Sequence, residues 1–136
     1  IADGVWSGPY TVAGGQIELA AEAGKIFVGR MPEPSVLEPL RLVLPTRSGS
    51  TRAHQLNVPG VWVSLYRSLA AKVGRDLDHL ETLPISKLTT SDFFVRIETG
   101  FDSDPHVLIV NDNATPLTVR CLMLDTSIHG VRSLPG

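Results

Sequence analysis

Residues that can carry catalytic chemistry gather in the last third of the chain. Two nucleophiles, Ser127 and Cys121, occur there together with two histidines, His106 and His129. Nucleophilic catalysis needs a hydroxyl or thiol, a general base beside it and a third group that orients the base. Carboxylates that could orient a base are Asp102, Asp104 and Asp125. A small hydrolase that uses Ser127 or Cys121 with His129 or His106 is therefore one alternative function.

The spacing of these residues matches no established nucleophile motif. Ser127 and His129 are two positions apart, so both side chains face the same side of an extended strand. No G-x-S-x-G segment is present. Cys121 lies between apolar neighbours in a predicted strand, where no helix terminus could activate its thiol. We expect Cys121 to be a buried core residue, and we assign no catalytic residue.

Oxygen ligands for a cation occur in the FDSDPH segment, where Asp102 and Asp104 precede His106. A D-x-D pair supplies carboxylates of the kind that calcium uses, but the glycine and the distal glutamate of the EF-hand loop are missing. The four histidines form no H-x-H or H-E-x-x-H pair. Because Asp, Ser and Pro are typical of turns, we expect a polar turn here, and no metal or cofactor site.

Charge and composition exclude several function classes. The 12 Lys and Arg residues stand against 14 Asp and Glu residues, whereas a general nucleic-acid binder would carry a basic excess. The single cysteine allows no internal disulfide, and no apolar run reaches the ~18 residues of a membrane span. We expect one β-rich domain over residues 1–136, part of a longer or processed chain, in a cytoplasmic or virion-associated location rather than a secreted one.

Strands are the main elements that must position these residues, and the first third of the chain already predicts them. Apolar side chains predict a short strand around residues 5–6. Alternation of apolar and polar residues predicts strands over 16–22 and 25–30, joined as a hairpin. The Gly14-Gly15 pair predicts a turn before them.

Prolines and small polar residues interrupt the pattern between residues 31 and 55. Three prolines in 31–39 predict a loop at the rim of the fold, because proline cannot donate to a sheet ladder. Residues 40–44 are apolar and predict a short strand. Residues 46–55 are polar, basic and small, which predicts a loop.

The middle of the chain carries the clearest helical pattern. Apolar residues recur at three- and four-residue steps in 61–73, which predicts a helix with one apolar stripe. That stripe contains Trp62 and Tyr66, which we expect in the core rather than in an exposed aromatic patch. Gly74 is typical of the residue after a helix, and residues 75–83 predict a second short helix.

Alternating and continuous apolar segments predict strands again after residue 91. Residues 92–99 place Phe93, Val95 and Ile97 on one face of a strand, with polar and aromatic residues on the other. Residues 106–110 are almost continuously apolar. They predict a central strand that is buried on both faces.

The end of the chain predicts an antiparallel hairpin. The turn cluster of residues 111–116 connects 106–110 to a further strand over 117–125, and residues 128–134 predict an edge piece. The whole pattern indicates a mainly β fold with one or two helices. We expect an antiparallel β-sandwich with a covering helix.

Several short segments of the second half occur in an order that resembles a known domain. They follow the segment 61–73 and read Ile109-Val110-Asn111-Asp112, Pro116-Leu117, Leu124-Asp125 and Ser127-Ile128. In these features residues 61–136 resemble the C-terminal accessory β-domain of caspase-like (peptidase C14) proteins. The resemblance implies a domain that binds, senses or docks, with the catalytic His and Cys on another segment. No catalytic residue is carried over.

Three hypotheses about function follow. The first is a non-catalytic β-sandwich module for interaction or assembly, of which an accessory domain of a caspase-like effector is one form. An alternative is a structural domain of a capsid or virion surface, which loops rich in Pro and Gly and a near-neutral charge would suit. The third is the hydrolase. The first two need a protein partner or self-association, with residues 31–39, residues 46–55 and Trp6 as candidate contacts.

Overall fold

The computed structural model describes residues 1–30, 32–39, 43, 45–46, 49–50, 54–97 and 99–129. These residues form strands and no helix. The strands are β1 (Ser35–Leu37), β2 (Pro45–Thr46), β3 (Gly49–Ser50), β4 (Gln55–Ser68), β5 (Lys72–Asp76), β6 (His79–Thr82), β7 (Thr89–Arg96), β8 (Leu108–Asn111) and β9 (Val119–His129). The expectation of a mainly β protein is therefore confirmed, and the covering helix is not observed. No helix long and apolar enough to cross a membrane occurs in these ranges.

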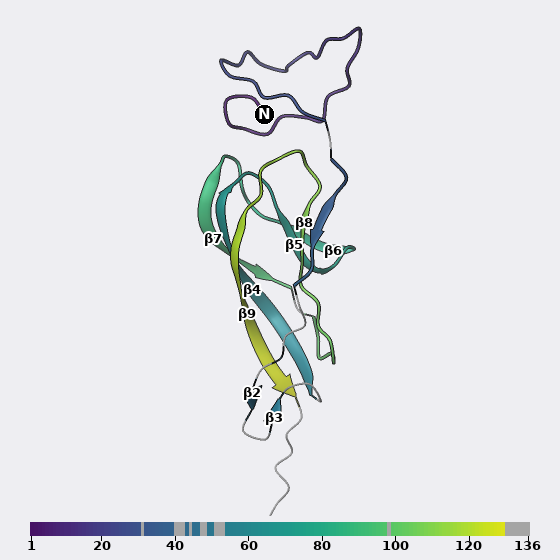
Figure 1. Cartoon of the computed structure of the whole chain (residues 1–136), viewed down its shortest axis with the longest axis vertical. Helices are drawn as coiled ribbons and strands as arrows, with labels where there is room; N and C mark the ends of the chain where they lie inside the picture. The colour runs from purple at the N-terminus through teal and green to yellow at the C-terminus, as the bar shows by residue number, and fades with distance from the viewer. Residues whose placement is uncertain are drawn as a thin grey trace, which may run out of the picture.

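All strand pairings are antiparallel and fall into three sheets. The larger sheets have the orders β1-β8-β5-β6 and β7-β4-β9, and β2 pairs with β3 alone. Strands β4 and β9 run side by side toward one end of the molecule (Figure 1). The opposite end is formed by the first 30 residues, which we call the N-terminal arm (Figure 1).

One hydrophobic cluster holds the two larger sheets together. From the three-stranded sheet it takes alternate residues of β4, of which Val61, Val63 and Leu65 have no exposed surface. From the four-stranded sheet it takes Val73 and Ile109. Alternation is expected because successive side chains of a strand point to opposite faces. Full burial of such side chains contributes roughly 1.5–3 kcal/mol each. The cluster therefore stabilises the packing of the two larger sheets against each other.

The helix predicted over 61–73 is wrong. Residues 61–68 continue β4, and residues 72–73 begin β5. The apolar stripe at helical spacing also fits a period of two, and β-branched and aromatic residues favour strands. Two neighbours decide the outcome, because β4 pairs with β7 on one side and β9 on the other. The second predicted helix, over 75–83, is also wrong and forms the β5-β6 hairpin.

The central strand predicted over 106–110 is confirmed, but its hairpin partner is wrong. Residues 107–110 are buried, and β8 lies between β1 and β5. The predicted return strand is β9, which pairs with β4 in the other sheet. The predicted turn cluster between them is confirmed. Asn111 organises it, since its side-chain amide donates to the Thr115 carbonyl at 2.9 Å, and this turn carries the chain between sheets.

The prolines around β1 restrict it to an edge. Residues 35–37 form a three-residue strand that, among the described strands, pairs with β8 alone, so the loop predicted over 31–39 is partly wrong. This edge position is the one that flanking prolines permit. The strand predicted over 40–44, except Val43, lies outside the described residues. So do residues 130–134 of the predicted edge piece and much of 46–55.

The N-terminal arm has turns and isolated bridges rather than regular strands. Reciprocal backbone hydrogen bonds join Ala13 and Gln16 across the predicted turn at Gly14 and Gly15, which is confirmed. Both glycines have positive φ, at 59° and 77°, as a two-residue turn of type I′ requires. The strand predicted around residues 5–6 and the hairpin of 16–22 with 25–30 are wrong. Bridges instead join Ala2 to Val5 and to Ile26.

Gly74 provides a test of how closely β5 and β6 approach. A Cβ atom on Gly74 would lie 1.8 Å from the backbone carbonyl oxygen of His79. Gly74→Ala should therefore force the hairpin apart and lower the free energy of unfolding by about 3 kcal/mol, measured by urea denaturation. Gly29→Ala is the matched control, because a Cβ there meets open space. An equal, small effect of both substitutions would contradict the close contact between β5 and β6 at Gly74.

Candidate protein-interaction surface

A row of large apolar side chains crosses the outer face of the three-stranded sheet. Trp62 of β4 lies opposite Phe94 of β7 and Met123 of β9 in the strand register. The rings of Trp62 and Phe94 lie 5.3 Å apart between centroids and are tilted by 50°. Trp62, Phe94 and Met123 are 45%, 48% and 50% exposed. We call these three residues the aromatic row.

The residues of β4 on either side of the aromatic row are small, so the row projects from the sheet. One register step away, Gly60 lies opposite Arg96 and Asp125, and on the other side Ser64 lies opposite Asp92 and Cys121. Both central positions are small. The Phe94 ring lies over Gly60, where a Cβ would come within 2.4 Å of the ring. The result is an apolar ridge with charged residues at its rim.

The exposure of this face overturns two expectations from the sequence. Trp62 and Tyr66, expected in the core, are each about half exposed. Cys121, expected to be buried, is also exposed. For β4 the reason is its period, because residues three positions apart share a helical stripe but point to opposite faces of a strand. Cys121 lies opposite Ser64 on the outer face. Phe94 was assigned correctly to the face opposite Phe93 and Val95.

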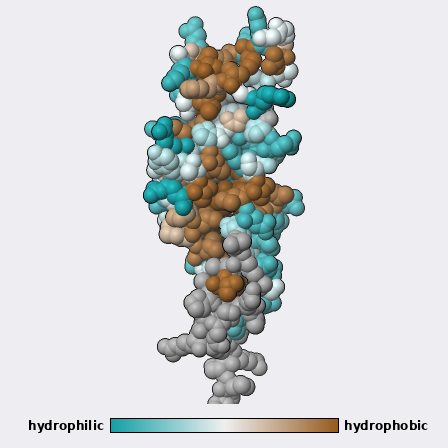
Figure 2. Space-filling model, viewed as in Figure 1, coloured by the Kyte–Doolittle hydropathy of each residue, from teal (hydrophilic) through white to brown (hydrophobic). Residues whose placement is uncertain are grey.

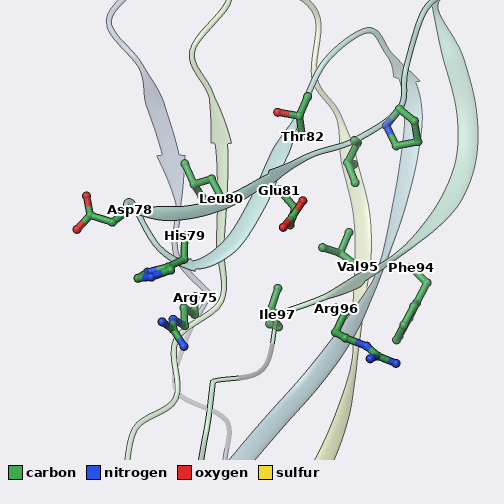
Figure 3. A pocket seen from close by; sticks show the side chains of 12 residues that line it. Arg75, Asp78, His79, Leu80, Glu81, Thr82, Phe94, Val95, Arg96 and Ile97 are labelled. Carbon is green, nitrogen blue, oxygen red and sulfur yellow. The ribbon is translucent and has the colours of Figure 1, made fainter.

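A groove of about 780 Å³ opens beside the row, between β6 and β7. These strands are edges of the two larger sheets, because each pairs on one side only in the described part of the chain. Val95 and Ile97 line it from β7 and Glu81 lines it from β6, while Phe94 and Arg96 extend outward on the β7 side (Figure 3). The groove thus extends from the edge of the hydrophobic core to the side of β7 that pairs with no other described strand.

The charged end of the groove is organised by the β5-β6 turn. Asp76 accepts hydrogen bonds from the backbone N–H groups of Asp78 and His79, at 2.9 and 2.8 Å. Its carboxylate also lies 2.7 Å from Nδ1 of His79. The His79 side chain lowers the pKa of Asp76 below its ordinary value of 3.8, and the backbone donors lower it further. These contacts fix the turn between β5 and β6.

The FDSDPH segment is a turn, as expected. Asp102 accepts a hydrogen bond from the backbone N–H of Asp104 at 3.1 Å, which lowers the pKa of Asp102. His106 does not join them: its Nδ1 lies 2.5 Å from Oε1 of Glu38. Across the described ranges, no group of three or more His, Cys, Asp or Glu side chains is arranged to hold a metal ion.

The described candidate catalytic residues are distributed along β9 and the segment that precedes β8. Cys121 and Ser127 lie six positions apart on β9, roughly 20 Å along an extended strand. His106 precedes β8 in the other sheet. Asp125 lies on the rim of the outer face, opposite Gly60. The side chain of His129 lies outside the described part of the structure.

No protein-family model and no curated protein matches this chain. The surface is therefore interpreted from its own residues. Sequence reasoning missed Trp62 and Met123 as surface residues, and the missed signal was the strict alternation of VWVSLY. Valine, tryptophan and tyrosine at a period of two are typical of a half-exposed strand. Of the contacts expected earlier, Trp6 is half-buried within the N-terminal arm, and β1 exposes Val36 and Leu37.

The Asp76–His79 pair gives a prediction that NMR can check. His79→Ala removes the largest cause of the lowered pKa, so the Asp76 pKa should rise toward 3.8. A group with a lowered folded-state pKa stabilises the fold above its unfolded pKa and loses that contribution as the pH falls. The variant should accordingly lose less stability on acidification below pH 4 than the parent chain. Carboxylate carbon shifts measure the pKa.

Asp102 is the internal control for that titration. Its lowered pKa has the Asp104 backbone N–H as the main cause, which His79→Ala leaves intact. The Asp102 pKa should therefore remain where it is. An unchanged Asp76 pKa in the variant would show that the imidazole does not hold the carboxylate.

Proposed function

We propose that this chain is a non-catalytic β-sandwich module that works through protein contact and assembly. The observation that carries the proposal is the aromatic row, with half the surface of each side chain open to solvent in the middle of a sheet. Interface cores are enriched in aromatic residues and Met, and central Trp residues are frequent sources of binding energy. The single cluster shared by two antiparallel sheets supports the sandwich.

The polarity of the face also supports this proposal. In an antiparallel sheet with one solvated face, polar residues normally occupy the outward positions. Here the three aligned outward positions of β7, β4 and β9 are Phe, Trp and Met. Hydrophobic surface also covers the arm and forms a second band across the body that carries the sheets (Figure 2). Contiguous apolar patches of this kind mark sites of association.

Two of the earlier hypotheses are forms of this proposal. A virion-surface domain would use the same face in a repeated, symmetric assembly. An accessory domain of a caspase-like protein would use it to dock, and the resemblance of residues 61–136 stays a prediction. The hydrolase alternative has no comparable support, since His106 contacts Glu38 and precedes a strand of the other sheet, whereas Cys121 and Ser127 lie on β9.

The proposal is tested by the mass of the protein in solution. Light scattering across a concentration series should give a defined oligomer for the parent chain. Trp62→Ser should weaken association about 30-fold or more, since a central Trp contributes about 2 kcal/mol or more. Leu77→Ser is the matched control, because Leu77 is 62% exposed but lies in the β5-β6 turn. A monomeric parent chain at every concentration would rule out self-assembly.

A further inference from the structure

We propose that a strip of the N-terminal arm, residues 25–29, adds as a parallel strand to the free edge of β7 in a second copy of the chain. Its inward side chains would fill the β6-β7 groove, and its outward Phe27 would extend the aromatic row. This inference rests on the proposed function, because it names a second copy as the partner and the arm as its contact. Strand addition to a sheet edge is a recurrent mode of recognition.

The acceptor is an edge strand with little protection. β7 has eight residues and pairs with β4 alone in the described part of the chain. Its segment Phe93-Phe94-Val95 is apolar, with no proline, bulge or covering helix. Edges of this kind present unpaired N–H and C=O groups that invite another strand. The groove beside it is open and has a mixed lining, with apolar Val95 and Ile97 from β7 and the Glu81 carboxylate from β6 (Figure 3).

The donor is an exposed apolar segment in the arm. Ile26, Phe27 and Val28 are 49%, 58% and 73% exposed. One edge of this segment is already paired within the arm, because Ala2 bridges Ile26 and the Phe27 N–H donates to the Ile1 carbonyl. Apolar arm residues surround an open hollow of about 830 Å³ rather than a packed core. The apolar side chains of the strip are therefore only partly covered within the arm.

The side-chain pattern of the strip matches that of β7. In the segment 25–29 (KIFVG), Lys25 and Phe27 point to one side of an extended strand, with Ile26 and Val28 on the other. In the segment 92–96 (DFFVR), Asp92, Phe94 and Arg96 point outward and Phe93 and Val95 inward. Pairing Phe27 with Phe94 therefore also brings Ile26 and Val28 to the inner, apolar side. These two side chains fit the interior of the groove.

Charge sets the direction of the added strand. With Phe27 beside Phe94, a parallel strand brings Lys25 next to Asp92 and Gly29 next to Arg96. An antiparallel strand would bring Lys25 next to Arg96, and like charges opposite each other are destabilising. The structure gives neither Lys25 nor Asp92 an ion pair within its described residues. Pairing across copies thus satisfies both charges.

A complementation experiment tests the inference. Val28→Asp disables the strip, and Phe94→Lys disables the edge by removing the ring and placing a cation near Lys25. Both substituted positions are exposed, so each variant should fold, and each alone should associate at least about tenfold more weakly. Mixed together, the two should form a 1:1 complex, because the strip of the Phe94→Lys copy meets the intact edge of the Val28→Asp copy.

The readout is fluorescence anisotropy of the Phe94→Lys copy labelled at Cys121, which is exposed on β9 at the opposite edge of the sheet. Titration with the Val28→Asp chain should raise the anisotropy to saturation. Titration with the double variant Val28→Asp, Phe94→Lys should not. If the parent chain assembles but the mixture does not, the strip-to-edge contact is wrong while the proposed function stands. If the parent chain stays monomeric, the strip-to-edge contact is wrong and self-assembly is ruled out with it, while docking to a different protein is the form of the proposed function that remains.

The direction of the strand has its own test, which uses exposed charges and leaves the fold alone. Lys25→Glu should weaken parent-chain association about two- to fivefold, as expected for like charges across strands. Asp92→Lys combined with Lys25→Glu should restore it. Stronger association of Lys25→Glu on its own would indicate Arg96 as the neighbour and overturn the parallel arrangement.

Discussion

The pairing of β4 on both sides is the constraint on which the rest of this structure depends. Because β7 and β9 each bond to it, its side chains must alternate between the core and the outer face. Val61, Val63 and Leu65 then supply the centre of the hydrophobic cluster. Trp62 is forced outward by the same alternation. The stability of the fold and the exposure of the aromatic row therefore have one cause.

The parts of the fold that the sequence predicts are those with a single local solution. Turns at Gly14-Gly15 and at residues 111–116, the faces of β7 and the two-sided burial of β8 follow from side-chain type alone. Residues 61–73 fit a helix and a strand equally well, and only pairing with β7 and β9 separates the two. Which strands β8 and β9 pair with likewise depends on long-range contacts. No local pattern specifies it.

The residues of the candidate surface likewise differ in whether a local sequence pattern or the strand register places them. Phe94 could be placed on the outer face because DFFVR alternates without a competing helical period. Trp62 was misplaced because its segment also fits a helical period besides the alternation of VWVSLY, and the alignment of Trp62 and Met123 with Phe94 depends on the strand register. Small residues add a further long-range condition, because Gly60 admits the Phe94 ring at a distance that any side chain would forbid. The ridge is thus a property of three strands together.

Edge strands of soluble proteins normally carry charges, prolines or bulges that prevent pairing with other chains. The edge of the four-stranded sheet at β1 follows this rule, since prolines flank it on both sides. The edge at β7 carries charges at Asp92 and Arg96, but the three residues between them are apolar and lie beside the aromatic row. Because the chain protects one edge and leaves another open, other chains can add to it at a restricted set of sites. A module that assembles in a defined geometry needs such a restriction, because unprotected edges on every side would lead to uncontrolled aggregation.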